Sequence, residues 1–239
     1  MKRETPKFVE YTSNYFPRNT RDMMTSPVGA GLTTETARVE AFSDGVFAVA
    51  ITLLVLEIKV PGYDTDLATQ LLRQWPSYLA FCISFAFIGI MWMNHHRLFT
   101  HIKKSDDMML IFNLALMFSV CIIPFTTALL AAHIGHPGAR TAVIVYDASY
   151  LLIAVFFNLL WRYAASRNGH LLAADVNRES VEKITQQYNY GPLAYAIAIA
   201  LAWVSITASL LINLVLAFFF AIPPHYASRT VPARRSNSR

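Results

Sequence analysis

Three side chains at the start of the first long apolar block of the sequence could form a polar network or line an ion path. Arg38 is followed by Ser43 and Asp44, and the chain then continues through mostly apolar residues to Pro61. Charged groups within a membrane-length segment are costly, and they mark polar networks or ion paths. A simpler interpretation is also open, because an acid near a helix N-terminus complements the helix dipole and a serine there can cap the helix. The motif by itself is compatible with both.

More polar groups stand where the next two apolar blocks would meet this motif. The second block ends in Trp92, Asn94, His95, His96 and Arg97, and the third carries Asn113 near its start. These side chains offer enough donors and acceptors to satisfy Ser43 and Asp44 at membrane depth. We therefore expect a network that fixes the first helix against the second and third, made of Arg38, Phe42, Ser43, Asp44, His96 and Asn113.

One face of the first apolar block is a candidate pore lining. At about 100° per residue, Val49, Leu53 and Leu56 fall in one narrow sector of a helix. Phe42 lies inside that sector, and Gly45 and Thr52 border it. Ordinary helix packing would give the same stripe, so the periodicity alone does not establish a pore.

Other reactive residue types in the chain have plainer interpretations. Adjacent histidines such as His95 and His96 point to different faces of a helix, so the pair is a poor metal site and no metal is predicted. Glu57 could attract cations to a pore mouth, or pair with Lys59 or Arg73. The two cysteines lie inside apolar blocks and are expected to act as small hydrophobic side chains. No paired carboxylates or metal-spaced cluster indicates an enzyme.

The composition indicates a helical membrane protein with a single membrane domain. Hydrophobic residues make up 55% of the 239 positions, more than in an ordinary soluble domain. They are gathered into blocks of membrane-crossing length, near 39–60, 75–93, 108–132, 141–161 and 191–222. We therefore predict an all-α, polytopic membrane protein, with an interruption at Pro124 in the third span.

The distribution of basic residues predicts the number of spans. Lys and Arg collect on the cytoplasmic side of membrane proteins. The N-terminal segment through Arg38 holds six of them, residues 94–107 hold three and residues 162–190 hold four, whereas the connections on the other side hold only Lys59, Arg73 and Arg140. The four arginines of the C-terminal tail also belong inside, which requires an even number of spans. We expect six spans, at about 39–60, 75–95, 108–132, 141–162, 190–204 and 207–222, with both termini cytoplasmic.

The polar segments are assigned to the cytoplasm. Residues 1–34 are expected to form a disordered arm, and residues 223–239 a basic tail that contacts anionic lipid. Val181, Ile184 and Tyr188 stand at helical spacing between spans four and five, which favours an amphipathic helix along the membrane surface. The net charge of +5 arises beside the spans, so no nucleic-acid role is expected.

The motif Arg38…Phe42-Ser43-Asp44, with the apolar run that ends Leu56-Glu57-Ile58-Lys59-Val60-Pro61, resembles the transmembrane-protein-175 family of potassium channels. The likeness extends over about residues 35–222 and includes His95-His96-Arg97, Asn113, Pro124-Phe125 and the paired final spans. Bacterial members have one six-span unit in each subunit, and animal members carry two in tandem. With one copy of the motif, this chain is similar to the bacterial form.

The resemblance implies a homotetramer in which the first span of each subunit surrounds a central pore. It implies narrow apolar rings at Val49, Leu53 and Leu56, and a polar ring at Thr52 that favours potassium. No sequence like Thr-Val-Gly-Tyr-Gly is present, so the usual carbonyl filter is missing and only modest selectivity is expected. The expected function is passive potassium conduction across the plasma membrane without a cofactor. The alternative is a proton-coupled transporter that uses Asp44 and the span-two histidines.

Overall fold

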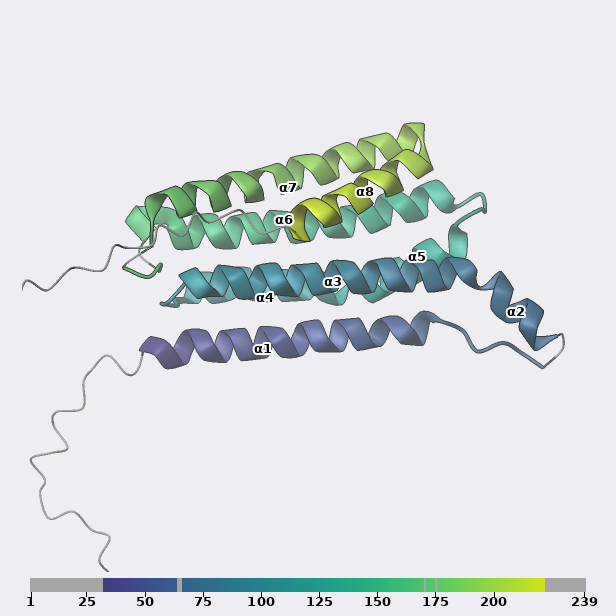
Figure 1. Cartoon of the computed structure of the whole chain (residues 1–239), viewed down its shortest axis with the longest axis horizontal. Helices are drawn as coiled ribbons and strands as arrows, with labels where there is room; N and C mark the ends of the chain where they lie inside the picture. The colour runs from purple at the N-terminus through teal and green to yellow at the C-terminus, as the bar shows by residue number, and fades with distance from the viewer. Residues whose placement is uncertain (1–31, 64–65, 170, 175, 222–239) are drawn as a thin grey trace, which may run out of the picture.

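Most of the described residues lie in helices, which pack together as a bundle (Figure 1). The computed structural model describes residues 32–63, 66–169, 171–174 and 176–221. No β-strand occurs in these ranges, which hold a single isolated bridge between Ile102 and Leu172. The predicted arm and basic tail fall almost entirely outside them. The helices are α1 (Leu32–Leu53), the 3₁₀ turn η2 (Leu54–Glu57), α2 (Leu67–Arg73), α3 (Trp75–His101), α4 (Asp107–Cys121), α5 (Ile123–His133), α6 (Ala139–Gly169), α7 (Arg178–Val204) and α8 (Ile206–Ala221).

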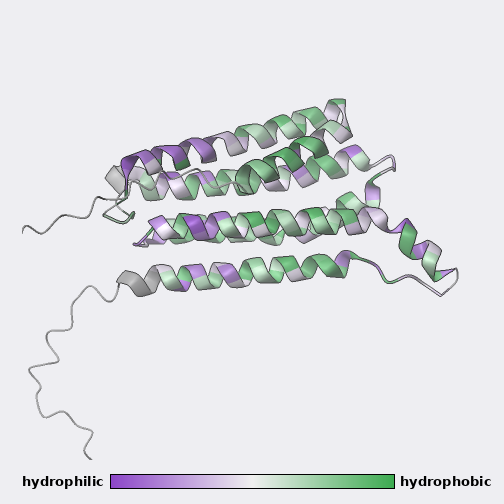
Figure 2. Cartoon of the chain, viewed as in Figure 1, coloured by the Kyte–Doolittle hydropathy of each residue, from purple (hydrophilic) through white to green (hydrophobic). Residues whose placement is uncertain are grey.

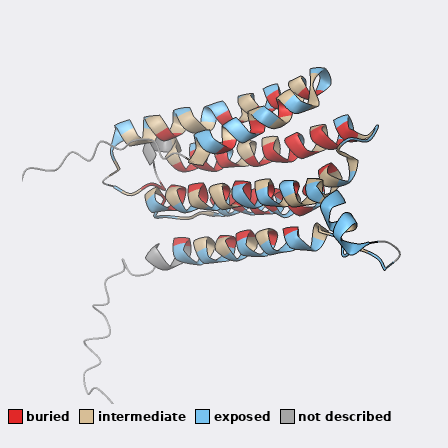
Figure 3. Ribbon diagram, turned by 45° about the vertical axis from the view of Figure 1, so that its right-hand side comes forward, coloured by how far each residue is buried: buried red, intermediate tan, exposed pale blue. Residues whose placement is uncertain are grey.

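Helix α1 presents one face to the bundle and leaves the other uncovered. Ser43, Phe47, Ala50 and Leu54 are buried, and their spacing places them along one side of the helix. Helix α1 packs against α3 and α4, and the turn η2, which carries Leu54, packs against α3 and α5. The opposite side of α1 is exposed along its length (Figure 3). The α-helix passes into a 3₁₀ turn at Leu54, as helix C-termini often do.

The third predicted span is interrupted where the sequence predicts it. Helix α4 ends at Cys121 and α5 begins at Ile123. A proline lacks an N–H and its ring clashes with the carbonyl four residues earlier, so Pro124 prevents a regular helix from continuing through this point. The chain instead makes a tighter bond, in which Ile122 N–H donates to Ser119 O at 3.3 Å.

The second half of the chain differs from the sequence-based expectation. Residues 178–190 are not a separate helix along the membrane surface; they are the first half of α7, which runs on through Pro192 to Val204. Helix α7 packs along α6 over much of its length. Polar contacts hold its first half there: Trp161 Nε1–H donates to Thr185 Oγ1 at 2.8 Å, and Arg162 Nη2–H donates to Asn189 Oδ1 at 2.8 Å. These hydrogen bonds explain why the polar segment packs against α6.

A short helix that the sequence analysis missed follows α1. Helix α2 extends beyond the end of the bundle (Figure 1). Asp66 caps it by accepting the backbone N–H and the hydroxyl of Thr69. These two hydrogen bonds lower the pKa of the Asp66 carboxyl.

Within the described residues, four helical stretches are long and apolar enough to cross a membrane: Thr36–Glu57, Trp75–His101, Asp107–His133 and Ala139–Ser166. Helix α8 is apolar but shorter, and the apolar half of α7 follows a hydrophilic half (Figure 2). Such a set of apolar helices defines a multi-span membrane protein.

Candidate functional site

A chain of buried hydrogen bonds connects α3, α4 and α1. His95 Nε2–H donates to Asn113 Oδ1 at 2.9 Å, and Asn113 Nδ2–H donates to Ser43 Oγ at 3.0 Å. Ser43 completes the chain by donating to Val39 O at 2.8 Å. His95, Asn113 and Ser43 are all buried. The chain holds α1 in one rotational setting, because Ser43 must face α4 to take part.

His95 is surrounded by aromatic rings. The rings of Phe47, Phe99 and Phe157 lie 5.5, 4.6 and 6.4 Å from its own ring, centroid to centroid. Its Nδ1 has no hydrogen-bond partner within the described part of the chain. A cationic imidazole would need an acceptor at both nitrogens. The geometry therefore describes a neutral histidine whose single proton sits on Nε2.

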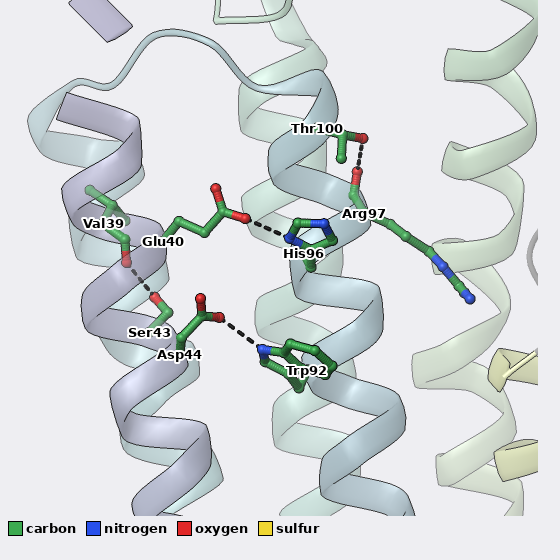
Figure 4. A network of polar contacts seen from close by, with 8 residues as sticks. All are labelled: Val39, Glu40, Ser43, Asp44, Trp92, His96, Arg97 and Thr100. Carbon is green, nitrogen blue, oxygen red and sulfur yellow. Dashed lines mark hydrogen bonds and ion pairs between the residues drawn. The ribbon is translucent and has the colours of Figure 1, made fainter. Parts of the chain in front are cut away.

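Two further contacts join α1 to α3 on a more exposed side (Figure 4). Trp92 Nε1–H donates to Asp44 Oδ1 at 2.9 Å, and His96 Nδ1 lies 2.6 Å from Glu40 Oε1. The rings of Trp92 and His96 stack one turn apart on α3. The acids of α1 are thus held by side chains of α3.

The structure places the predicted network residues as follows. Ser43 and Asn113 contact each other directly, while Asp44 and His96 contact Trp92 and Glu40 instead. Arg38 is exposed and forms no ion pair with Asp44 among the described residues. Six positions separate them, which turns them to different sides of a helix. Phe42 is exposed on the outer side of α1.

Sequence reasoning missed the central role of His95 and the contribution of Glu40. A signal for His95 exists: Met91 and Phe99 lie four residues to either side of it, and both are apolar. This spacing places His95, rather than His96, on the buried face of α3. Glu40 carries no comparable signal.

The arginine that follows the two histidines has a separate role. Arg97 extends away from α1 (Figure 4). Its Nη1–H donates to Asn94 Oδ1 at 3.2 Å, and Nη2 lies 3.4 Å from Ala221 O at the end of α8. Asn94 Nδ2–H donates to Phe220 O at 3.1 Å. A cation beside the carbonyls of a helix C-terminus is stabilising, so this pair anchors α8 on α3.

The residues predicted to line a pore lie on the uncovered face of α1. The exposed fractions of Val49, Leu53 and Leu56 are 57%, 41% and 66%, and Thr52 is also exposed. Thr52 Oγ1–H donates to Val49 O at 2.9 Å. Glu57 is half-buried, and its Oε2 lies 3.9 Å from Lys59 Nζ. None of these side chains is enclosed within its own protomer.

The described residues contain no group of three or more His, Cys, Asp or Glu side chains arranged to hold a metal ion. What they do contain is a helix with an exposed, largely apolar outer face, whose buried inner face is held to α4 through the hydroxyl of Ser43. These features define a class, the polytopic helical membrane proteins with an internally anchored first helix.

Comparison with known proteins places the chain within this class. The sequence model described as "Endosomal/lysosomal potassium channel TMEM175" matches residues 38–124. A potassium channel of Chamaesiphon minutus is 49% identical over 192 residues, which cover 79% of this chain and 94% of that protein. The crystal structure of a lysosomal potassium-selective channel TMEM175 homolog from the same organism superposes with a TM-score of 0.72 at 47% identity, covering 79% of this chain and 97% of the other. The chain belongs to the TMEM175 family of potassium channels.

The chain is also similar to proteins that are named as proton channels. An endosomal/lysosomal proton channel TMEM175 of Danio rerio is 35% identical over 142 residues, which cover 52% of this chain and 27% of that protein. The permeant ion therefore has to be argued for this chain itself.

Proposed function

We propose that this protein is a potassium-permeable cation channel, formed by a homotetramer in which α1 of each subunit surrounds a central pore. One observation carries the proposal. The inner face of α1 is fixed by the chain from His95 to Ser43, and this setting turns Val49 and Leu53 away from the protomer. An apolar face that is fixed outward must be covered by lipid or by other subunits. Copies of α1 arranged around an axis would cover it.

The narrowest part of this pore is a hydrophobic constriction. Val49, Leu53 and Leu56 would form successive rings that offer an ion no ligands. Leu56 stands on the 3₁₀ turn three residues after Leu53, and side chains at this spacing eclipse one another in a 3₁₀ helix. Rings of this kind close a pore by excluding water, and they conduct when they widen enough for partly hydrated ions.

Two polar positions would favour cations near the constriction. The hydroxyl hydrogen of Thr52 is used on Val49 O, so the Thr52 oxygen lone pairs remain to face a passing ion. At the outer end, Glu57 is only loosely associated with Lys59 at 3.9 Å. A ring of Glu57 carboxylates would raise the local cation concentration. Neither feature builds a dehydrating filter, so the preference for potassium over sodium should be modest.

The topology that we propose has six crossings with both termini in the cytoplasm, in a plasma membrane. Four crossings are the long apolar stretches. The remaining two are the apolar half of α7 and the 16-residue α8, joined at Ser205. Both are shorter than the roughly 20 residues of a typical span, so they would tilt little and thin the bilayer locally. The basic tail would then meet anionic lipid on the cytoplasmic leaflet.

Cysteine accessibility tests whether the outer face of α1 meets water. Val49 on α1 and Val215 on α8 are exposed to similar extents in the protomer, 57% and 64%. In a background that lacks Cys82 and Cys121, we expect Val49→Cys to react with a membrane-impermeant thiol reagent and the reaction to reduce the current. Val215→Cys, facing lipid, should stay unlabelled. Equal protection of the two thiols would contradict a pore along α1.

The alternative function is a proton-coupled transporter that uses Asp44 and the span-two histidines. The contacts favour a structural role for these groups, since Asp44 accepts from Trp92 and His95 is enclosed by phenylalanines. Purified protein in liposomes separates the two functions. A potassium gradient without a pH gradient should drive cation flux through the channel. No flux until a pH gradient is imposed would favour the transporter.

A further inference from the structure

A buried acid outside the α1 network lies in the membrane-spanning part of α6. Asp147 has no exposed surface. Ser209 Oγ lies 2.6 Å from Asp147 Oδ2, and Asn213 Nδ2–H donates to Asp147 Oδ1 at 2.6 Å. Both partners come from α8. Neither is charged, so the carboxyl group has no counter-ion in these contacts.

The oxygen atoms around Ser209 need more hydrogens than the serine carries. Ser209 Oγ is 2.6 Å from Asp147 Oδ2 and also 2.9 Å from Ala198 O on α7. Both separations are those of O–H···O hydrogen bonds. A serine hydroxyl donates one hydrogen, and Ala198 O can only accept. If Asp147 were a carboxylate, both short contacts would have to share the single hydrogen of the Ser209 hydroxyl.

We propose that Asp147 is a proton-binding site: it carries a hydrogen on Oδ2 and donates it to Ser209 Oγ. Ser209 then donates its own hydrogen to Ala198 O, and Asn213 donates to the carbonyl oxygen of the neutral acid. Every short contact in this arrangement holds one hydrogen. The bound proton makes a continuous link from α6 through α8 to α7.

The surroundings of the carboxyl group agree with a neutral acid. Its titratable neighbours are phenols, Tyr146 on the same helix and Tyr195 on α7, while α8 contributes only Ser209 and Asn213. No Lys, Arg or His of the described residues forms an ion pair with Asp147. An uncompensated carboxylate at this depth is strongly disfavoured, and a carboxyl group in such a place takes up a proton instead.

Infrared spectroscopy of the purified, lipid-reconstituted channel tests the proposal directly. A carboxylic acid has a carbonyl stretch that is separate from those of carboxylates and amides and that shifts in D₂O. We expect wild-type protein at neutral pH to show this band and Asp147→Asn to lose it. The matched control is Asp66→Asn. Asp66 is the exposed cap of α2, and because the pKa of its carboxyl group is lowered, this variant should leave the band in place.

A second measurement separates the bound proton from a negative charge that the fold requires. The amide of Asp147→Asn can donate to Ser209 and accept from Asn213, so this variant should keep the wild-type melting temperature and oligomer. Asp147→Ala can form neither hydrogen bond, so it should have a lower melting temperature and should fail to form the wild-type oligomer. If the infrared spectrum is unchanged in Asp147→Asn, or if that variant is as unstable as Asp147→Ala, Asp147 is ionised and the proposal is wrong. The same result would follow if an alkali cation, rather than a proton, neutralised the carboxylate.

Discussion

Asn113 on α4 donates its side-chain N–H to the hydroxyl oxygen of Ser43 on α1 across 3.0 Å, between positions 70 apart in the sequence. The amide oxygen of the same Asn113 accepts from His95 on α3. The buried amide of Asn113 therefore fixes the positions of α1 and α3 relative to α4. Because Ser43 and Val49 stand on opposite sides of α1, the inner contact also decides what the outer face presents.

Removing the serine hydroxyl should destabilise the protein. Ser43→Ala leaves Asn113 Nδ2 buried without an acceptor, and an unsatisfied buried donor costs about 1–3 kcal/mol. We expect a lower melting temperature in thermal unfolding of the reconstituted protein. Ser119→Ala is the matched control, since Ser119 is also buried but donates only to Ala115 O within α4. Equal losses in the two variants would show that the Ser43 contact contributes nothing special.

A polar residue in the proposed constriction should make the channel leak. Leu53→Ser would let water wet the ring that Leu53 forms, and a wetted pore conducts where a dry one does not. Leu214 on α8 has the same exposed fraction in the protomer, 41%, so Leu214→Ser is the control. Liposome potassium flux should rise well above wild type for Leu53→Ser alone. Unchanged flux would remove Leu53 from the constriction.

The acid of the motif is expected to act on assembly before selectivity. Asp44→Ala deprives Trp92 Nε1–H of its acceptor, at a cost of about 1 kcal/mol for a partly exposed hydrogen bond. Asp44→Asn keeps an oxygen acceptor and should restore the yield of the proposed tetramer in size-exclusion chromatography. The potassium-to-sodium permeability ratio should be the same in whatever Asp44→Ala tetramer forms. A changed ratio with normal assembly would place Asp44 in the ion path.

Much of this fold is predictable because the apolar blocks and their interruptions are local properties of the sequence. Pro124 breaks its helix for a steric reason that acts within one turn, and the structure has the break there. The buried stripe Ser43, Phe47, Ala50 and Leu54 likewise follows from helical spacing. Partners across helices are harder to predict. His95 and His96 have the same side chain, and only the phase of α3 decides that one meets Asn113 and the other Glu40.

The errors in the second half of the chain have the same origin. Residues 178–190 are polar enough to suit a membrane surface. Thr185 and Asn189, however, form hydrogen bonds with side chains of α6, and the segment is the first half of α7. Asp147 stands alone in an apolar block, which marks it as a residue with a polar partner or a function. Its meaning depends on Ser209 and Asn213, more than 60 positions away. Such long-range pairing is not visible in local periodicity.

The connection between α3 and α4 offers a last prediction, because one carboxylate there serves two elements. Asp106 Oδ1 accepts Met109 N–H and caps α4, while Oδ2 accepts the hydroxyl of Tyr163 on α6 at 2.8 Å. Loss of an N-cap costs about 0.5–2 kcal/mol, so Asp106→Ala should lower the melting temperature more than Tyr163→Phe, which keeps the ring against Phe112.

The two changes remove one shared contact, so their effects should not add. The double variant Asp106→Ala/Tyr163→Phe should be about as stable as Asp106→Ala alone, since the phenol has already lost its acceptor on that carboxylate. Asp106→Asn, which keeps an oxygen on the cap, should recover most of the stability. The melting temperatures of the wild type, the two single variants Asp106→Ala and Tyr163→Phe, and the double variant complete the cycle. Strictly additive losses would mean that Tyr163 and Asp106 act independently, and that α4 and α6 are held together at this end by the backbone bonds from Lys103 and Lys104 to Leu171 O.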